Sequence, residues 1–154
     1  MKLEAQWIVG FVDGEGCFHV GISQNKNSST GVQVLPEFVV TQHKRSIQVL
    51  YALKDFFQSG IVRHSRGKNS EIMCFRIRNT KVLRETVIPF FEKHPLKTTK
   101  NIDFRRFRKV LLFMERGDHL TSVGVEKIRT YISRPKEKFY PQNLFETEAF
   151  QTEK

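Results

Sequence analysis

Two carboxylates near the N-terminus, Asp13 and Glu15, are the residues of this 154-residue chain whose type and spacing suggest catalysis. They alternate with Gly14 and Gly16 and follow an apolar segment with helical spacing. The C-terminal end of a helix carries negative partial charge, so carboxylates there are unfavourable unless a cation is bound. Carboxylate and carbonyl oxygens are the ligands that hard divalent cations prefer. The pattern predicts a cation site; the alternative is an acidic turn that simply ends a core helix.

The segment that precedes these carboxylates predicts a helix with one unusually small face. Its apolar residues recur at helical spacing: Leu3, Trp7, Ile8 and Phe11. Gly10 and Gly14 lie four residues apart and therefore share a face. Each interior glycine lowers helix stability by up to about 1 kcal/mol relative to alanine. Close packing of a second helix on the glycine face would offset that loss, as it does between other small-residue faces.

The stretch Trp7-Ile-Val-Gly-Phe-Val-Asp-Gly-Glu-Gly16 resembles the LAGLIDADG motif of homing endonucleases, in the variant that ends Gly-Phe-x-Asp-Gly-Glu/Asp-Gly. In that family the second acidic residue of the motif binds the metal, which implies Glu15 here, together with the carbonyl of Gly14. The resemblance implies Mg²⁺ as the cofactor, with Mn²⁺ as an alternative. Ca²⁺ is then expected to support DNA binding without cutting.

A chain with one such motif has only one metal-binding carboxylate of this kind, whereas cutting both DNA strands needs two. In the family that the motif resembles, single-motif members work as homodimers on nearly palindromic sites, so two chains supply the two carboxylates. The resemblance therefore implies a homodimer with both Glu15 side chains near the symmetry axis. The expected interface residues are Trp7, Gly10, Phe11, Asp13 and Gly14, with Asp13 capping or buttressing the partner helix.

Two more positions match functional places in the family. A polar residue after the second strand orders water there, and Gln42 is our choice. The run Pro95-Leu-Lys-Thr-Thr-Lys-Asn-Ile-Asp-Phe104 resembles the family's Leu-x-Thr-x-Lys-x-x-Asp-Phe pattern, whose lysine stabilises charge during cleavage. Lys100 fits that register best, and Lys97 is the alternative.

The charge distribution favours a polyanionic partner. The chain has 26 Lys+Arg against 16 Asp+Glu, a net charge of +10. Residues 60–109 hold 14 of the Lys and Arg and 4 of the acids, which accounts for the whole excess. Neutralising phosphates supplies much of non-specific nucleic-acid affinity. A merely basic protein without such a partner is the alternative.

The pattern of apolar residues predicts an α+β fold: helix, strand pair, helix, strand pair, helices. We expect an antiparallel curved sheet for DNA with helices on its other face, as in the αββαββα fold of the LAGLIDADG family. The expected strands span 17–24, 32–42, 61–66 and 71–78, and the later helices 44–58, 81–88, about 99–116 and 122–132. Pro36 suggests that the second strand is an edge or bulged strand. We also expect Thr80 to cap a helix and Pro89 to break or kink it.

We expect one LAGLIDADG domain over residues 1–132 and a C-terminal tail, 133–154, that is extended or docked on the core. Polar and basic side chains fall on the strand faces opposite the core, where they would read base edges and phosphates. The expected DNA-binding residues are His19, Ser23, Asn25, Gln33, Thr41, Arg63, Arg66, Lys68, Arg76 and Arg78. Leu35 and Val39 share that face and would contact thymine methyls. An ordinary solvated sheet face is the alternative.

Other chemistries find little support. Cys17 and Cys74 are too few for a disulfide scaffold or a zinc site, and we expect reduced thiols. The histidines show no metal-site spacing, and no Ser/His/Asp set, Walker loop, CxxC or Rossmann fingerprint is present. We see no secretory signal and no apolar run long enough to span a membrane, so we expect no membrane partner and an intracellular protein. The resemblance implies a chloroplast or mitochondrion, with a bacterial cytoplasm as the alternative.

The leading hypothesis is a site-specific homing endonuclease. It would make a staggered double-strand cut by metal-assisted phosphodiester hydrolysis, as a homodimer on a long pseudo-palindromic DNA site. One alternative is a LAGLIDADG maturase, which keeps the fold but binds RNA and assists splicing. Another is a non-catalytic basic RNA- or DNA-binding module.

Overall fold

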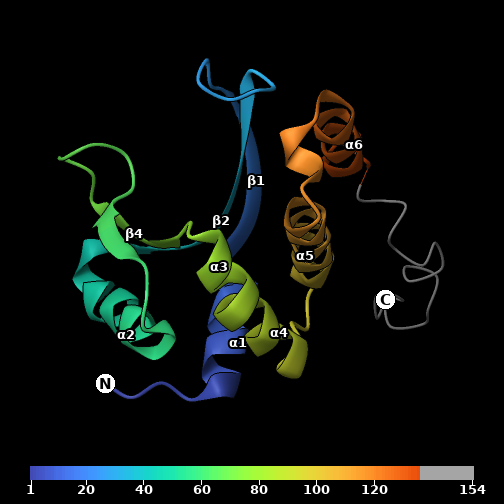
Figure 1. The fold of residues 1–154 in the computed structure, drawn as a ribbon. Helices are drawn as coiled ribbons and strands as arrows, with labels where there is room; N and C mark the ends of the chain where they lie inside the picture. The colour runs from blue at the N-terminus through green and yellow to red at the C-terminus, as the bar shows by residue number, and fades with distance from the viewer. Residues whose placement is uncertain (136–154) are drawn as a thin grey trace, which may run out of the picture.

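The computed structural model describes residues 1–135 (Figure 1). Its elements follow the predicted order of helix, strand pair, helix, strand pair and helices, which confirms the α+β class. They are α1 (Ala5–Glu15), β1 (Gly16–Gln24), β2 (Val32–His43), the 3₁₀ turn η1 (Lys44–Ser46), α2 (Ile47–Phe57), β3 (Ile61–His64), β4 (Ile72–Ile77), α3 (Thr80–Val82), the π-turn η2 (Leu83–Val87), α4 (Ile88–Lys93), α5 (Lys100–Glu115), the 3₁₀ turn η3 (Asp118–Leu120) and α6 (Ser122–Ile132).

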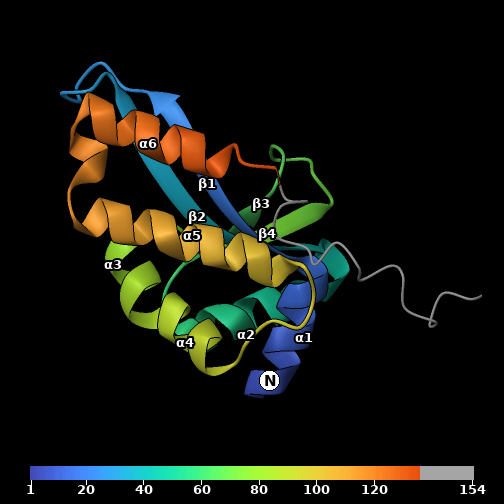
Figure 2. The same ribbon diagram turned by 90° about the vertical axis from the view of Figure 1, so that its right-hand side faces the viewer.

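The four strands form one antiparallel sheet in the order β1-β2-β4-β3. Helices cover one face of it: α5 packs on β1 and β2, and α2 packs on β2, β3 and β4. Figures 1 and 2 show the long β1–β2 hairpin reaching away from α1 alongside α5 and α6. The other face of the sheet carries no helix of the described chain, as the sequence predicted.

The prediction that Pro36 makes β2 an edge or bulged strand is wrong for the strand as a whole. β2 lies inside the sheet, between β1 and β4. Its pairing with β4 begins only at Phe38, whereas Pro36 is paired with Val20 of β1 alone. Proline lacks the N–H of a ladder bond and is tolerated where a strand has a neighbour on one side only. Pro36 therefore occupies a local edge of an interior strand.

Two predictions about the helix before α5 also need correction. The cap is Asn79 rather than Thr80, since Asn79 Oδ1 accepts a hydrogen bond of 3.1 Å from the N–H of Val82. A break at Pro89 is wrong, because the helical path continues; whether it kinks there stays a prediction. The chain widens into η2, where the N–H of Ile88 bonds to the carbonyl of Leu83, and α4 follows directly with Pro89 in its first turn. Proline has no N–H to donate and its ring crowds the carbonyl four residues earlier in a regular α-helix, and the wider turn directly precedes it.

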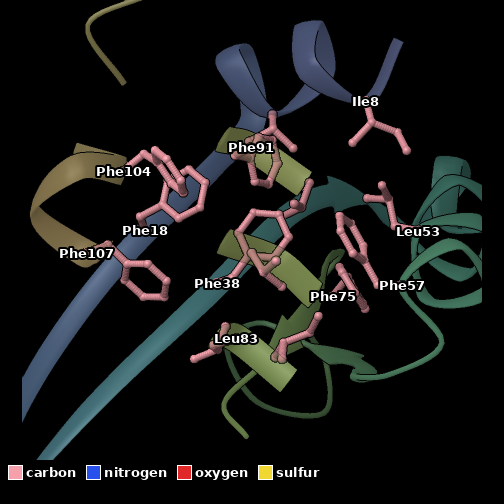
Figure 3. Close-up of a cluster of buried hydrophobic side chains, with 14 of the residues drawn as sticks. Ile8, Phe18, Phe38, Leu53, Phe57, Phe75, Leu83, Phe91, Phe104 and Phe107 are labelled. Carbon is pink, nitrogen blue, oxygen red and sulfur yellow. The ribbon is translucent and has the colours of Figure 1, made fainter. Parts of the chain in front are cut away.

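Phenylalanine rings fill the space between sheet and helices (Figure 3). Phe18 of β1 packs its ring 5.1–5.4 Å from the rings of Phe38, Phe91, Phe104 and Phe107, centroid to centroid. Burying one such side chain stabilises a fold by about 1.5–3 kcal/mol. No polar or charged side chain is buried within residues 1–135. The polar side chains are thus left to the surface, including the open face of the sheet.

The last helices end as predicted, with one adjustment. Gly117 has φ +83°, a left-handed conformation that ends α5. Phe104, Phe107 and Leu111 form the expected buried stripe, while Met114 is only half-buried. Of the expected tail, residues 136–154 lie outside the described part, so its form stays a prediction.

Candidate active site

Glu15 is the last residue of α1, and its side chain is exposed. The chain passes straight from this helix into β1 at Gly16, whose N–H still bonds to the carbonyl of Val12. A Cβ at position 16 would lie 2.6 Å from Val12 Cγ1 and 2.9 Å from Val12 O. Only glycine fits this junction, so Gly16 fixes the carboxylate of Glu15 at the point where helix and sheet meet.

The donors at this point suit a hard divalent cation. Because residues from Cys17 onward belong to β1, the carbonyls of Gly14 and Glu15 have no following helical turn to bond. These oxygens and the Glu15 carboxylate are the ligand type of Mg²⁺ and Ca²⁺. Within the described chain no group of three or more His, Cys, Asp or Glu residues gathers around a possible ion.

Asp13 joins the end of α1 to the segment before α5. Its Oδ2 accepts a hydrogen bond of 2.7 Å from the N–H of Lys97. Its Oδ1 accepts bonds from the N–H and the hydroxyl of Thr98, at 3.2 and 2.7 Å. Asp13 is thus engaged within its own chain, and the expected contact with a partner helix stays a prediction. These bonds place both candidate lysines near the motif: Lys97 directly against Asp13, and Lys100 at the first residue of α5, its N–H bonded to Thr98 Oγ1.

Gln42 lies at the same end of the sheet. Gly16 pairs with Val40, so Gln42 is two residues beyond the start of β1 and half-buried. By strand alternation it points to the same side of the sheet as Val40. The predicted catalytic residues therefore come from three elements, α1, β2 and the start of α5, that converge at the C-terminal end of α1.

The outward face of α1 is open. A Cβ built at Gly10 or Gly14 would meet no atom of residues 1–135 within 4 Å. Beside the glycines, the rings of Trp7 and Phe11 stack with centroids 4.8 Å apart, and Trp7 is 44% exposed. The helix thus presents a flat surface of two glycines and two aromatic rings, which we call the glycine face.

The expected DNA-binding residues on the strands occupy the open face of the sheet, which the helices do not cover. Strand pairing sets them in rows: Ser23 beside Gln33, then Thr41, Cys74 and Arg63 across three strands, then Val39, Arg76 and Ile61. Asn25 begins the β1–β2 loop, and Arg66 and Lys68 are exposed in the β3–β4 turn. Burial and the nearby charge of Arg78 lower the pKa of Arg76.

Sequence reasoning missed one acidic residue on this face. Glu37 follows Leu35 by two residues and therefore points to the same side, opposite His19 of β1. Its Oε2 lies 2.7 Å from Nε of Arg78, in an ion pair. Strand alternation is sufficient to place Glu37 on the open face, but the expected DNA-binding residues were chosen without considering acids among the basic side chains.

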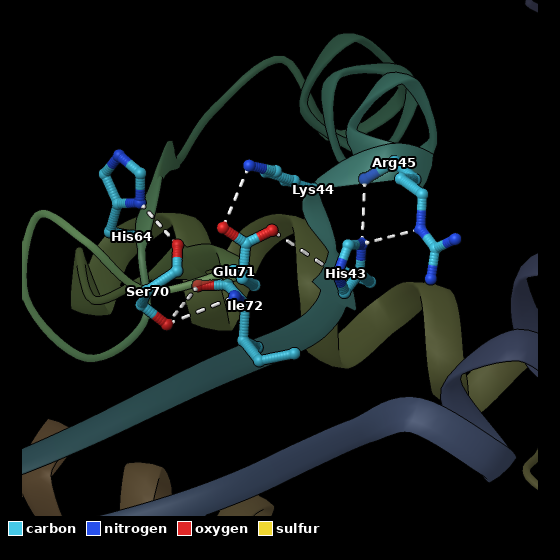
Figure 4. Close-up of polar contacts among 7 residues, drawn as sticks. All are labelled: His43, Lys44, Arg45, His64, Ser70, Glu71 and Ile72. Atoms are coloured by element: carbon cyan, nitrogen blue, oxygen red, sulfur yellow. Dashed lines mark hydrogen bonds and ion pairs between the residues drawn. The ribbon is translucent and has the colours of Figure 1, made fainter.

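A second missed group lies where β2 enters η1 (Figure 4). Glu71 accepts a hydrogen bond of 2.9 Å from Nζ of Lys44, and its other oxygen lies 3.6 Å from Nε2 of His43. The hydrogen bond from Lys44 is the main cause that lowers the pKa of Glu71. Nδ1 of His43 accepts bonds from the N–H and Nε of Arg45, at 3.2 and 3.3 Å. These contacts join η1 to the start of β4, beside Gln42.

Two further observations concern the rest of the described chain. Neither Cys17 nor Cys74 forms a disulfide, and burial raises the pKa of the Cys74 thiol. Among the helices within residues 1–135, none has the length and apolar character needed to cross a membrane.

The chain is similar to known endonucleases. The family model described as LAGLIDADG endonuclease matches residues 8–111. The DNA endonuclease I-CeuI of Chlamydomonas moewusii is 36% identical over 88 residues, which cover 57% of this chain and 40% of that protein. The chain thus spans less than half the length of this curated relative.

Solved structures give the same result over more of the chain. The crystal structure of the homing endonuclease I-TnaI has a TM-score of 0.80 and 51% identity, covering 90% of this chain and 94% of that one. I-SmaMI, solved with an uncleaved DNA target in the presence of calcium ions, has a TM-score of 0.78 and 27% identity, covering 83% of this chain and 43% of that one. With the matching fold, motif and family model, the chain belongs to the LAGLIDADG endonuclease family.

Proposed function

We propose that this chain is a site-specific DNA endonuclease that cuts both strands of a pseudo-palindromic site as a homodimer. The observation that carries the proposal is the position of Glu15. It is an exposed carboxylate at the end of a helix whose glycine face has no partner within residues 1–135. Two relatives support the proposal. The homing endonuclease I-TnaI is covered over 94% of its own length, and I-SmaMI was solved with a DNA target.

The glycine face supports dimerisation. A second α1 packed on Gly10 and Gly14 would approach closely, because neither position carries a side chain. A two-fold axis along this contact would bring the two Glu15 carboxylates together, since Glu15 follows Gly14 directly. The oxygens that one chain lacks for a cation would then come from the second chain and from the DNA phosphates.

Mg²⁺ is the proposed cofactor, and it would supply an activated water and stabilise the leaving oxygen. In this proposal the Glu15 carboxylate and the Gly14 carbonyl hold the ion. Gln42 orients water by hydrogen bonding, and Lys100 or Lys97 places positive charge near the phosphate. The bonds from Asp13 to Lys97 and Thr98 hold the lysine segment against the end of α1.

The open sheet face is the proposed DNA-binding surface. Arginine reads guanine, glutamine and asparagine read adenine, and hydroxyls bind either bases or phosphates. Such groups lie in rows across the strands, with Arg66 and Lys68 exposed in the turn beyond them. With DNA as substrate we place the protein inside the cell, in an organelle or a bacterial cytoplasm.

A cleavage assay tests this function. Wild type and Glu15→Gln would be incubated with a randomised library of near-palindromic duplexes, in Mg²⁺ or in Ca²⁺. We expect discrete double-strand cuts by the wild type in Mg²⁺, binding without cuts in Ca²⁺, and binding without cuts by the variant. Full activity of Glu15→Gln would contradict the role of Glu15. Binding with no cut in any duplex would instead favour the maturase or the non-catalytic binding module.

A further inference from the structure

One carboxylate and three arginines lie on the open face of the sheet. Arg63 and Arg76 lie on β3 and β4, Arg78 lies just beyond β4, and Glu37 lies in the middle of β2. Glu37 forms an ion pair with Arg78, and the charges of Arg78, Glu37 and Arg63 act on Arg76. An acid at this place reduces the positive potential that attracts phosphates, so it weakens non-specific binding.

Glu37 holds Arg78 at one specific atom. Its Oε2 lies 2.7 Å from Nε of Arg78, a short charge-assisted hydrogen bond. A guanidinium carries five N–H donors, and the two terminal nitrogens hold four of them. Because the contact is to Nε, the far edge of the guanidinium, formed by one N–H of each terminal nitrogen, is not the edge that meets the carboxylate.

The two side chains differ in exposure. The Glu37 side chain is 18% exposed, whereas that of Arg78 is 49% exposed. The carboxylate thus lies low on the sheet while the guanidinium reaches outward from it. Arginine is the usual bidentate reader of guanine O6 and N7, and the far edge of the guanidinium supplies two N–H donors in one plane for such a contact.

We propose that Glu37 is a positioning residue that fixes the plane of Arg78 so that Arg78 reads one guanine in each DNA half-site. The inference rests on the proposed DNA-binding role of the sheet. Arg63 is held differently, since its Nε donates to the carbonyl of His64 at 3.3 Å. Of the three arginines, Arg78 is the one ion-paired to an acid among the described residues, so a charge-assisted bond orients its plane.

The test is a binding selection on half-sites in which each base pair is randomised. Wild type should prefer guanine at one position of each half-site. Arg78→Ala and Glu37→Ala should lower the preference at that position by about tenfold, the effect of losing one bidentate contact, and leave other positions unchanged. Glu37→Gln should keep part of the preference, because its amide oxygen still accepts from Nε.

The chain offers a matched control. Glu92 and Arg108 form an ion pair with the same 2.7 Å contact to Nε, in the helical layer rather than on the sheet. Glu92→Ala removes an equivalent bond and should leave the preference at every position as in wild type. A loss of preference in both alanine variants would indicate general destabilisation and overturn the positioning role.

A modified base gives a second readout. 7-Deazaguanine lacks the N7 acceptor, so placing it at the selected position should weaken wild-type binding by several-fold and leave Arg78→Ala unaffected. An unchanged guanine preference in Glu37→Ala, or the loss of a preference for an A·T pair instead, would overturn the inference while leaving the endonuclease proposal intact. A wild type with no base preference at any position would overturn both.

Discussion

The inward and outward faces of α1 differ in what they contact. Ile8 and Val12 on the inward face are 0% exposed and belong to the aromatic core. On the outward face, Gly10 and Gly14 meet nothing within 4 Å in the described chain. The inward face is explained by the fold of one chain. The outward face lowers helix stability without a contact in residues 1–135 that offsets the loss, and we propose that a second molecule packs on it.

The glycines of the motif differ in the same way. Gly16 is required by the fold, because a Cβ there would overlap Val12. A Cβ at Gly10 or Gly14 would overlap no atom of residues 1–135. The motif thus combines one glycine that the fold requires with two for which we propose a role in assembly, and substitutions at these positions separate the two.

The largest expected effect is the loss of cleavage when Glu15, at the C-terminal end of α1, is changed. Glu15→Gln removes the charge that holds the cation but keeps the shape of the side chain. Losing even an outer-shell partner of a metal lowers activity by about 10–100-fold, so we expect a loss of cleavage of at least about 100-fold. The measurement is cleavage rate in Mg²⁺, with Glu4→Gln at the other end of α1 as control. Equal losses in both variants would speak against a specific role of Glu15.

Gly10→Leu should damage assembly but not the single chain. A leucine on the glycine face keeps two helices apart, so dimerisation and double-strand cutting should fall together. The monomer should be as stable as wild type or more stable by up to about 1 kcal/mol, because glycine is a poor helix former. Sedimentation and urea unfolding measure the two effects. A dimer that survives this change would place the interface elsewhere.

Gly16→Ala should show the reverse pattern. The added Cβ would lie 2.6 Å from Val12 Cγ1, so the junction of α1 and β1 must shift. Overpacking of this kind lowers stability by about 1–3 kcal/mol, which urea unfolding of the variant would show. If Gly16→Ala left stability unchanged and Gly10→Leu lowered it, the contrast between the two kinds of glycine would be wrong.

Asp13→Ala should have a moderate effect on stability. It removes three hydrogen bonds to Lys97 and Thr98. The freed donors are exposed and bind water instead, so we expect a loss of about 1–2 kcal/mol in urea unfolding. Under conditions in which the variant is fully folded, its cleavage rate should still be lower than that of wild type, because the lysine segment is no longer held to α1. Unchanged cleavage would mean that neither lysine needs this anchor.

The smallest effect concerns the polar group around Glu71. Lys44 lowers the pKa of Glu71 below its ordinary 4.5, so this contact stabilises the fold above pH 4.5 and is lost as pH falls below it. Glu71→Gln should remove that part of the pH dependence of thermal unfolding. Because the pair is exposed, salt should weaken the effect in wild type. A variant with the wild-type pH profile would show that the contact adds nothing to stability.

Much of the fold followed from local patterns. The motif predicted α1, and strand alternation placed Gln33, Thr41 and Arg76 on the open face of the sheet. The predictions that were wrong or missing depended on contacts between residues distant in sequence. The place of Pro36 could not be judged without knowing where β4 begins to pair, and the bonds of Asp13 join residues more than eighty positions apart. Asn79 and Thr80 are both good helix caps, so only the local geometry decides between them.

The catalytic roles of Glu15, Gln42, Lys97 and Lys100 stay predictions, and the structure adds the connections between their elements. The expected DNA-binding residues did not include Glu37, because they were chosen for positive charge or neutral hydrogen-bonding groups. Its ion pair with Arg78 becomes visible only when β2 and β4 lie side by side.

The central claim is that two chains each supply one Glu15 to a shared site. Its most direct test is cleavage of a supercoiled plasmid carrying the selected site by wild type coexpressed with Glu15→Gln. If two chains contribute, mixed dimers hold only one intact carboxylate and should produce nicked circles that neither protein makes in quantity alone. If the mixture gives only linear plasmid, in proportion to the wild-type protein and without additional nicking, each chain cuts independently and the claim is wrong.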